Sequence, residues 1–142
     1  MTLDMNDLPN GFKPLFRTSP HLDNLGDFYY QGSGESMVIL VKVLDKNANA
    51  RGTAHGGFLS SLADISLGYA AATESDPPQK LVTTSMTLDY AGGVSVGDWV
   101  ESKVDVQKVG KRVAFANCYL SVNGTRIVRA SAVFQNYGDI IK

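Results

Sequence analysis

The chain lacks a second cysteine and a surplus of basic residues. It contains a single cysteine, Cys118, which excludes an internal disulfide and a cysteine-based metal site. Its 13 basic and 14 acidic residues leave a net charge of −1. Nucleic-acid-binding proteins carry a surplus of basic residues, so we expect no nucleic-acid partner.

Long hydrophobic runs are also missing from the sequence. No apolar stretch is long enough to span a membrane, so we expect no membrane partner. The first residues include Asp4, Asp7 and Pro9 where a signal peptide would have a basic start and an apolar run. We therefore expect a cytoplasmic protein. Hydrophobic residues still make up 44% of the 142 residues, enough for the core of a single domain spanning residues 1–142.

The pattern of turn residues and apolar residues predicts one long helix and about six strands. Residues 1–27 contain Pro9, Gly11, Pro14 and Pro20 and are predicted to form an extension with one short helix. One helix with antiparallel strands predicts an α+β fold in which a curved antiparallel sheet wraps the helix. We expect the last four strands to form a meander. The predicted strands are 28–30, 37–44, 81–90, 99–109, 113–122 and 126–137, and the helix is about 56–73.

Periodicity predicts which side chains face the core. In the strand at 81–90, alternation places Val82, Thr84, Met86, Leu88 and Tyr90 on one face. In the long helix, helical spacing predicts an apolar face that packs on the sheet, formed by Phe58, Leu62, Ile65 and Tyr69. The opposite, small-sided face contains Gly57, Ser60, Asp64, Gly68 and Ala71.

Asp64 is the main candidate for a functional residue. A lone carboxylate among small and apolar side chains is costly to desolvate, so it is usually present for a reason. The helix begins with His55, Gly56 and Gly57, which suit a tight turn and a close approach of bare backbone to a ligand. A helix N-terminus offers unpaired N–H groups that stabilise a developing oxyanion. Asp64 could then act as a general base or as a nucleophile.

These segments together resemble a known family. Residues 49–52, 55–57, 62–64 and 68 resemble the signature of hotdog-fold thioesterases of the phenylacetate-degradation type, and the likeness extends over about residues 37–137. The resemblance implies a central helix wrapped by a curved antiparallel sheet and a homodimer with joined sheets, often assembled into a homotetramer. It also implies hydrolysis of acyl-coenzyme A without a metal or another cofactor.

The resemblance also assigns roles to individual residues. Asp64 matches the catalytic carboxylate, and Gly56 matches the residue whose backbone N–H binds the thioester carbonyl. Asn49 and His55 match residues that shape that end of the site, and Thr83 matches a hydroxyl residue that holds the water. The sequence departs from the family at residues 91–93, which are Ala-Gly-Gly where relatives commonly carry a proline.

Each of these residues also has a purely structural interpretation. Asp64 could belong to a surface ion pair, and His55 could be a helix cap. Asn49 could be a turn residue, and Thr83 could be an ordinary β-branched strand residue. Further substrate contacts are predicted from the exposed backbone of Gly57 and from a basic hairpin that could meet the phosphates of coenzyme A or be simply solvated. The basic residues of this hairpin are Lys108, Lys111 and Arg112.

Spacing along the helix predicts a site shared by two chains. His55 and Asp64 are nine positions apart, which corresponds to about 13 Å along one helix. They cannot hold the same carbonyl carbon and oxygen within one chain. A two-fold dimer with antiparallel helices would bring Asp64 of one chain beside Gly56 of the other.

The predicted function is an acyl-CoA thioesterase acting on an aromatic or medium-chain acyl group. One alternative is a hotdog-fold hydratase or dehydratase, which would use a histidine and a carboxylate on an acyl thioester. Another alternative is an acyl-CoA-binding protein that does not turn over its ligand. Release of free thiol, hydration of an enoyl thioester, and binding without turnover distinguish the three.

Overall fold

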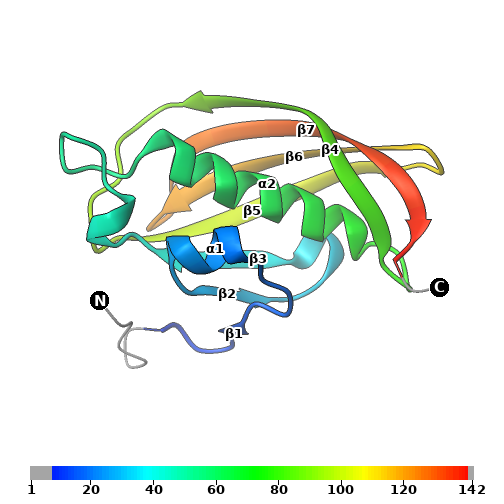
Figure 1. Cartoon of the computed structure of the whole chain (residues 1–142), viewed down its shortest axis with the longest axis horizontal. Coiled ribbons are helices and arrows are strands. Elements are labelled where there is room, and N and C mark those ends of the chain that lie inside the picture. Colours follow the sequence, from blue (N-terminus) through cyan, green and yellow to red (C-terminus); the bar gives the residue numbers. More distant parts are fainter. Residues whose placement is uncertain (1–7, 141–142) are drawn as a thin grey trace.

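One long helix lies against the concave side of a single curved sheet in the computed structural model, which describes residues 8–140 (Figure 1). The helix is α2, Gly56–Ala72, and the predicted helix at about 56–73 is confirmed. Asp4 and Asp7, used in the expectation about a signal peptide, lie outside the described residues. The strands are β1 (Lys13–Pro14), β2 (Phe28–Gln31), β3 (Val38–Lys42), β4 (Gln79–Tyr90), β5 (Trp99–Val109), β6 (Val113–Val122) and β7 (Thr125–Asp139).

The sheet has seven strands in the order β1-β2-β3-β5-β6-β7-β4, and every neighbouring pair is antiparallel. The α+β architecture predicted from the sequence is therefore confirmed. The additional strand is β1, whose two residues, one of them a proline, are too short to give a period-two signal. Among the described residues, no helix is long and apolar enough to cross a membrane.

The predicted four-strand meander is wrong, because β4 pairs with β7 at one edge of the sheet while β5 pairs with β3. The connection from β4 to β5, residues 91–98, is not a tight turn. Its Val94 carbonyl accepts a hydrogen bond from Ala54 N (2.8 Å), and its Asp98 carbonyl accepts one from Val43 N (2.9 Å). These bonds tie the connection to the entry of α2 and to the end of β3. The chain therefore passes from the edge strand β4 to β5, in the middle of the sheet.

Helix α2 buries a broader face than its sequence pattern predicts. Phe58 and Leu62 are buried as expected, but Ile65 and Tyr69 are only half-buried, and Ala71 is fully buried although we predicted it on the open side. The sheet curves around the helix and covers more than one stripe, so small side chains also face the core. The buried residues of α2 are Phe58, Leu59, Leu62, Ala63, Ser66, Leu67, Ala70 and Ala71.

A β-bulge in β4 changes which side chains face the helix. The pairing of β4 with β7 shifts between Thr83 and Ser85, which makes Thr84 an extra residue on β4. Before the shift, Val82 lies on the outer face and Thr83 pairs with the buried Phe134. The prediction that Val82 and Thr84 share a face with Met86, Leu88 and Tyr90 is therefore wrong. The bulge places Thr83 on the helix side, consistent with the tendency of bulges to redirect side chains next to functional sites.

The N-terminal segment packs along α2 and extends the sheet. Its short helix α1, Pro20–Leu25, is the one predicted within residues 1–27, and it begins at an N-cap serine, Ser19. His21 Nε2 lies 3.0 Å from Ser61 Oγ, which attaches α1 to α2. Elsewhere the segment packs Leu8 and Phe12 against a second apolar cluster around Tyr29 and Leu40.

Candidate functional site

Asp64 lies in the middle of α2 and is bonded to β4 by a single side-chain hydrogen bond. The Thr83 hydroxyl donates to Asp64 Oδ1 at 2.7 Å, across the space between the helix and the strand. Asp64 is half-buried, and among the described residues no cation lies within ion-pair distance of it. Its carboxylate is therefore oriented by a neutral donor. The sequence predicted both residues, and the bulge in β4 brings them together.

A pocket of about 670 Å³ opens beside Asp64, between α2, β4 and the N-terminal segment. On the helix it is lined by Ile65, next to Asp64, and by Gly68 and Tyr69, about one turn further along. The pocket wall is mostly apolar, with Leu81 and Phe134 from the sheet. A Cβ at Gly68 would lie in ordinary contact, 3.5 Å, with the Phe134 ring. The arrangement suits an apolar group whose reactive end lies next to a carboxylate.

The entry of α2 presents a backbone amide that the fold does not use. His55 is the N-cap, and its Nδ1 accepts a hydrogen bond from Gly57 N at 2.8 Å. Since Nδ1 is the acceptor, the proton of the neutral imidazole lies on Nε2. No acceptor for the Gly56 N–H is found in residues 8–140. Gly56 therefore offers a free donor at the positive end of the helix dipole, whereas the Gly57 N–H is occupied.

Two residues that the sequence analysis did not select hold this entry in place. Tyr90, at the end of β4, donates its hydroxyl to the Gly56 carbonyl at 2.9 Å. The side-chain amide of the buried Asn47 accepts from Leu44 N and donates to the Leu25 carbonyl, both at 2.8 Å. The backbone carbonyl of Asn47 accepts from His55 N at 2.7 Å. Nothing in the local sequence distinguishes Asn47 from other turn residues, because its partners are brought together only by the fold.

Asn49 serves the loop that precedes the helix. Its Oδ1 accepts from Arg51 N (2.9 Å) and Thr53 N (3.2 Å), and its Nδ2 donates to the Thr53 hydroxyl at 2.9 Å. All of these bonds stay within residues 49–53. The structure therefore gives Asn49 the geometry of a turn residue close to the entry of α2 and does not bring its side chain to Asp64.

The basic hairpin lies apart from the pocket. Lys108, Lys111 and Arg112 are exposed at the turn between β5 and β6, at the opposite end of the sheet from the start of α2 (Figure 1). Asn136 fixes this turn by donating its backbone N–H to the Arg112 carbonyl (2.8 Å) and its side-chain amide to the Gly110 carbonyl (2.9 Å). None of the three basic residues lines the pocket next to Asp64 within one chain.

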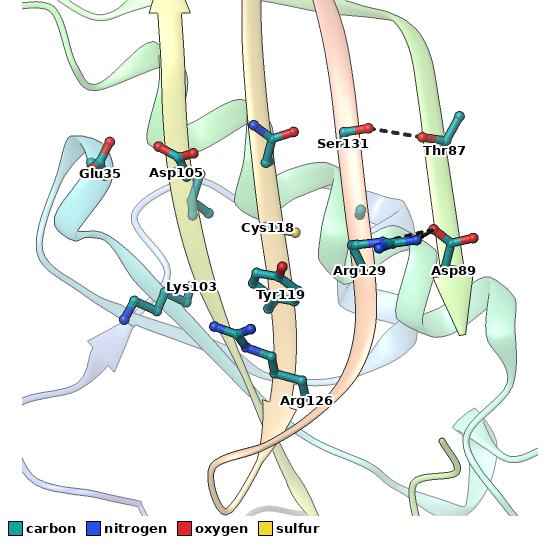
Figure 2. A pocket seen from close by; sticks show the side chains of 13 residues that line it. Glu35, Thr87, Asp89, Lys103, Asp105, Cys118, Tyr119, Arg126, Arg129 and Ser131 are labelled. Carbon is teal, nitrogen blue, oxygen red and sulfur yellow. Dashed lines mark hydrogen bonds and ion pairs between the residues drawn. The ribbon is translucent and has the colours of Figure 1, made fainter. Parts of the chain in front are cut away.

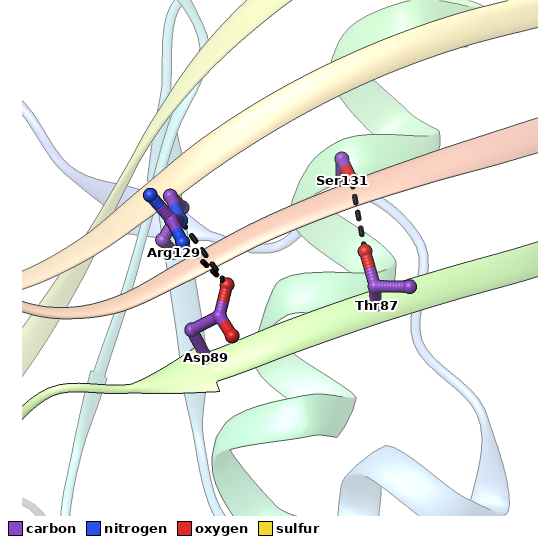
Figure 3. Close-up of polar contacts among 4 residues, drawn as sticks. All are labelled: Thr87, Asp89, Arg129 and Ser131. Carbon is purple, nitrogen blue, oxygen red and sulfur yellow. Dashed lines mark hydrogen bonds and ion pairs between the residues drawn. The ribbon is translucent and has the colours of Figure 1, made fainter.

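A second hollow, of about 550 Å³, lies on the outer face of the sheet, on the opposite side from α2 (Figure 2). Its strands carry rows of polar side chains that pair with one another. Arg129 donates to Asp89 Oδ2 from Nη2 (2.9 Å) and from Nε (3.1 Å), and the hydroxyls of Thr87 and Ser131 lie 3.0 Å apart (Figure 3). The guanidinium of Arg126 lies 3.8 Å from the centre of the Tyr119 ring.

Titration in the molecule reflects burial. Burial raises the pKa of the Tyr69 phenol; the Arg17 guanidinium opposes this shift, and the Asp64 carboxylate adds to it. Burial raises the pKa of the Cys118 thiol to about 12, so this cysteine is an inert part of the core at neutral pH. In the described part of the chain, no three His, Cys, Asp or Glu side chains converge on a possible metal position.

Sequence comparison identifies relatives of this chain. The family model described as "Thioesterase superfamily" matches residues 51–128, which is more than half of the chain. A Pseudomonas aeruginosa protein named "Putative esterase PA0474" is 46% identical over 131 residues, covering 92% of this chain and 98% of that protein. Acyl-coenzyme A thioesterase 13 of Mus musculus is 31% identical over 88 residues, covering 61% of each chain.

Solved structures share the fold. Zebra fish thioesterase superfamily member 2 superimposes with a TM-score of 0.75 at 25% identity, covering 84% of this chain and 88% of that one. The phenylacetic acid degradation protein PaaI of Thermus thermophilus, solved as a mutant, gives 0.73 at 24% identity over 82% and 98%. A hypothetical thioesterase of Streptococcus pneumoniae, solved with coenzyme A, gives 0.72 at 19% identity over 79% and 87%. This chain therefore belongs to the thioesterase superfamily, and its seven-stranded sheet around one long helix is the hotdog fold.

Proposed function

We propose that this protein hydrolyses acyl-coenzyme A thioesters, with Asp64 as the catalytic carboxylate. The observation that carries the proposal is the hydrogen bond from Thr83 to Asp64 at the rim of an apolar pocket. Relatives named as acyl-coenzyme A thioesterases and a structural neighbour solved with coenzyme A support the substrate class. The apolar pocket wall supports an aromatic or medium-chain acyl group.

The residues present can supply both parts of the chemistry. In one route Asp64 takes a proton from water as the water oxygen bonds to the thioester carbon, and that proton passes to the sulfur as the carbon–sulfur bond breaks. In the other route Asp64 attacks the carbon directly, the sulfur leaves and takes a proton from solvent, and water then hydrolyses the acyl–Asp64 anhydride to the free acid and restores the carboxylate. The carbonyl oxygen becomes negative on the way. A free amide such as Gly56 N–H stabilises this oxyanion more strongly than the neutral carbonyl, which lowers the barrier.

The two groups require a second chain in this proposal. Gly56 and Asp64 are eight positions apart on α2, about 12 Å along its axis. Strand β4 supports dimer formation, because its 12 residues form an edge of the sheet and include the exposed Val82 and Tyr90. Natural proteins rarely leave so long an edge unpaired. A second copy on this edge would cover it and bring each Asp64 towards the partner's α2 entry, and a homotetramer of two such dimers stays a prediction.

The hydration or dehydration of an acyl thioester is less well supported. That chemistry would use a histidine as the proton-transfer group, but the Nδ1 of His55 caps α2 through Gly57. The role that the contacts favour for His55 is to fix the geometry of the Gly56 amide. Asn49, which fastens the preceding loop, has the same kind of positioning role in this proposal.

A panel of acyl-CoA substrates with detection of the released thiol tests the proposal. We expect Asp64→Asn to reduce kcat by at least about 100-fold, since general-base groups contribute about 10² to 10⁴. The matched control is Asp89→Asn, which changes the same chemical group on the outer face and is expected to retain activity within about twofold. Equal activity of Asp64→Asn and the parent protein on the best substrate would refute the catalytic assignment. Thiol release absent in the parent, with hydration of an enoyl-CoA present, would favour the lyase alternative.

A further inference from the structure

The N-terminal segment forms part of the pocket although it lies outside the stretch matched by the thioesterase family model, residues 51–128. Two contacts hold it against Tyr69 of α2, which lines the same pocket as Asp64. The Tyr69 hydroxyl donates to the Arg17 carbonyl at 3.4 Å, and the rings of Phe16 and Tyr69 have their centres 5.2 Å apart. Phe16 and Arg17 both line the pocket. The pocket of this chain therefore has a wall that the family pattern does not specify.

Phe16 is unusual because its large ring is 49% exposed while being held in place by neighbours. It packs edge-on against Tyr30, with ring centres 5.0 Å apart, and also contacts the tilted ring of Tyr69. A ring held in this way presents a fixed apolar surface to the pocket. Covering such a surface with an apolar group removes it from water and is favourable.

The position of Phe16 relative to Asp64 gives it a defined place along a bound acyl group. Tyr69, which contacts the ring, follows Asp64 by five positions, about 7 Å along α2. If the thioester carbonyl lies beside Asp64, the carbons several bonds beyond it reach Tyr69 and Phe16. We propose, on the basis of the proposed thioesterase function, that Phe16 determines specificity by limiting the length and bulk of the acyl group.

The experiment compares a medium-length and a longer substrate, hexanoyl-CoA and decanoyl-CoA. Phe16→Ala enlarges the pocket, so we expect the ratio of kcat/KM for decanoyl-CoA to that for hexanoyl-CoA to rise by about tenfold or more. This is the discrimination that a hydrophobic pocket gives when one methylene group is added to or removed from the substrate. Phe16→Trp reduces the space and should lower the same ratio. Opposite shifts in the two variants cannot result from a general loss of folding.

Phe12 provides the matched control. It is a phenylalanine of the same segment, but it packs on the other side of the sheet against the cluster of Tyr29 and Leu40 and does not line the pocket. Phe12→Ala should therefore leave the ratio within about twofold of the parent value. A ratio that is unchanged in both Phe16 variants, or changed equally by Phe12→Ala, overturns the assignment of Phe16.

Binding separates this inference from the proposed function. In the Asp64→Asn background, calorimetry with the same two acyl-CoA molecules measures affinity without turnover, and adding Phe16→Ala should raise the relative affinity for decanoyl-CoA about tenfold. If the parent protein releases no thiol, the proposed hydrolysis fails, while the binding ratio still decides the role of Phe16. If hydrolysis depends on Asp64 but neither ratio changes, only the inference about Phe16 fails.

Discussion

Two hollows lie on opposite faces of the same sheet, and each contains a carboxylate held by a hydrogen bond. On the helix side, Asp64 accepts from the neutral hydroxyl of Thr83. On the outer side, Asp89 accepts from two nitrogens of Arg129, and both side chains are about two-thirds exposed, at 67% and 70%. The partner, and not the carboxylate, distinguishes the two regions: Asp89 is paired with a guanidinium, whereas Asp64 is bonded to a neutral hydroxyl.

The linings of the two hollows also differ: one is mostly apolar and the other is mostly polar. The wall of the helix-side pocket is mostly apolar and includes Ile65, Leu81 and Phe134. Apolar surroundings strengthen electrostatic effects. The outer hollow is lined by rows of charged and hydroxyl side chains whose partners lie on neighbouring strands (Figures 2 and 3). An exposed ion pair of this kind contributes little to stability or to chemistry.

Among the variants that keep Asp64, the largest expected effect comes from removing the free amide at the entry of α2. Gly56→Pro deletes this N–H at the first position of the helix, where proline is well tolerated, and His55 already has the extended conformation (φ −66°, ψ 137°) that precedes proline. We expect kcat to fall by about 10² to 10³, as for the loss of one oxyanion-stabilising donor. Steady-state thiol release measures the effect, and circular dichroism verifies the fold.

Gly56→Ala is the control for this change because it keeps the N–H, and its Cβ would lie at the contact distance of 3.4 Å from the Tyr90 ring. Its activity should stay well above that of Gly56→Pro.

The shared site is tested by refolding Gly56→Pro and Asp64→Asn chains together. Random pairing of two nearly inactive chains should restore about a quarter of the parent activity, because half of the dimers then contain one intact site. Absence of recovery would contradict a site built from two chains.

An intermediate effect is expected from a pair of threonines on β4. Thr83→Val removes the donor to Asp64 and keeps the shape of the side chain, so we expect kcat to fall by about ten- to a hundredfold, the value of a hydrogen bond to a charged group. Thr87→Val makes the same change four residues along the strand, where the hydroxyl meets Ser131 on the outer face, and should leave kcat within about twofold. Equal losses in the two variants would remove the distinction between the two faces.

The smallest effect concerns Cys118, a buried core residue on β6. Burial raises the pKa of its thiol from 9.0 to about 12, so the unfolded chain releases this proton at lower pH than the folded chain does. The associated stability is present below pH 9 and is lost as the pH rises towards 12, by at most about 1.4 kcal/mol per pH unit. Urea unfolding at pH 8, 9 and 10 measures this slope. Cys118→Ala should flatten it between pH 9 and 10, and an equal slope in that variant would contradict the assignment.

Much of the fold was predictable because local patterns and the tertiary structure agree. The bounds of α2 follow from the glycines that begin it and the prolines beyond it, and β5 and β6 were predicted with the bounds they have. The pairing of β4 was not predictable, because its period-two pattern is the same for any neighbour. The connection at 91–98 is held in place by hydrogen bonds from Ala54 and Val43, which are distant from it in the sequence.

From the sequence we predicted a hotdog fold, through a family resemblance, and singled out Asp64 and the glycine turn that begins the helix, because these signals come from residues close together in the chain. The surroundings of Asp64 and of the turn could be seen only in the folded structure. The bulge at Thr84 turned Thr83 towards Asp64, and the N-terminal segment placed Phe16 over Tyr69. Both depend on contacts between residues far apart in the chain, and such contacts leave no periodic signal in the sequence.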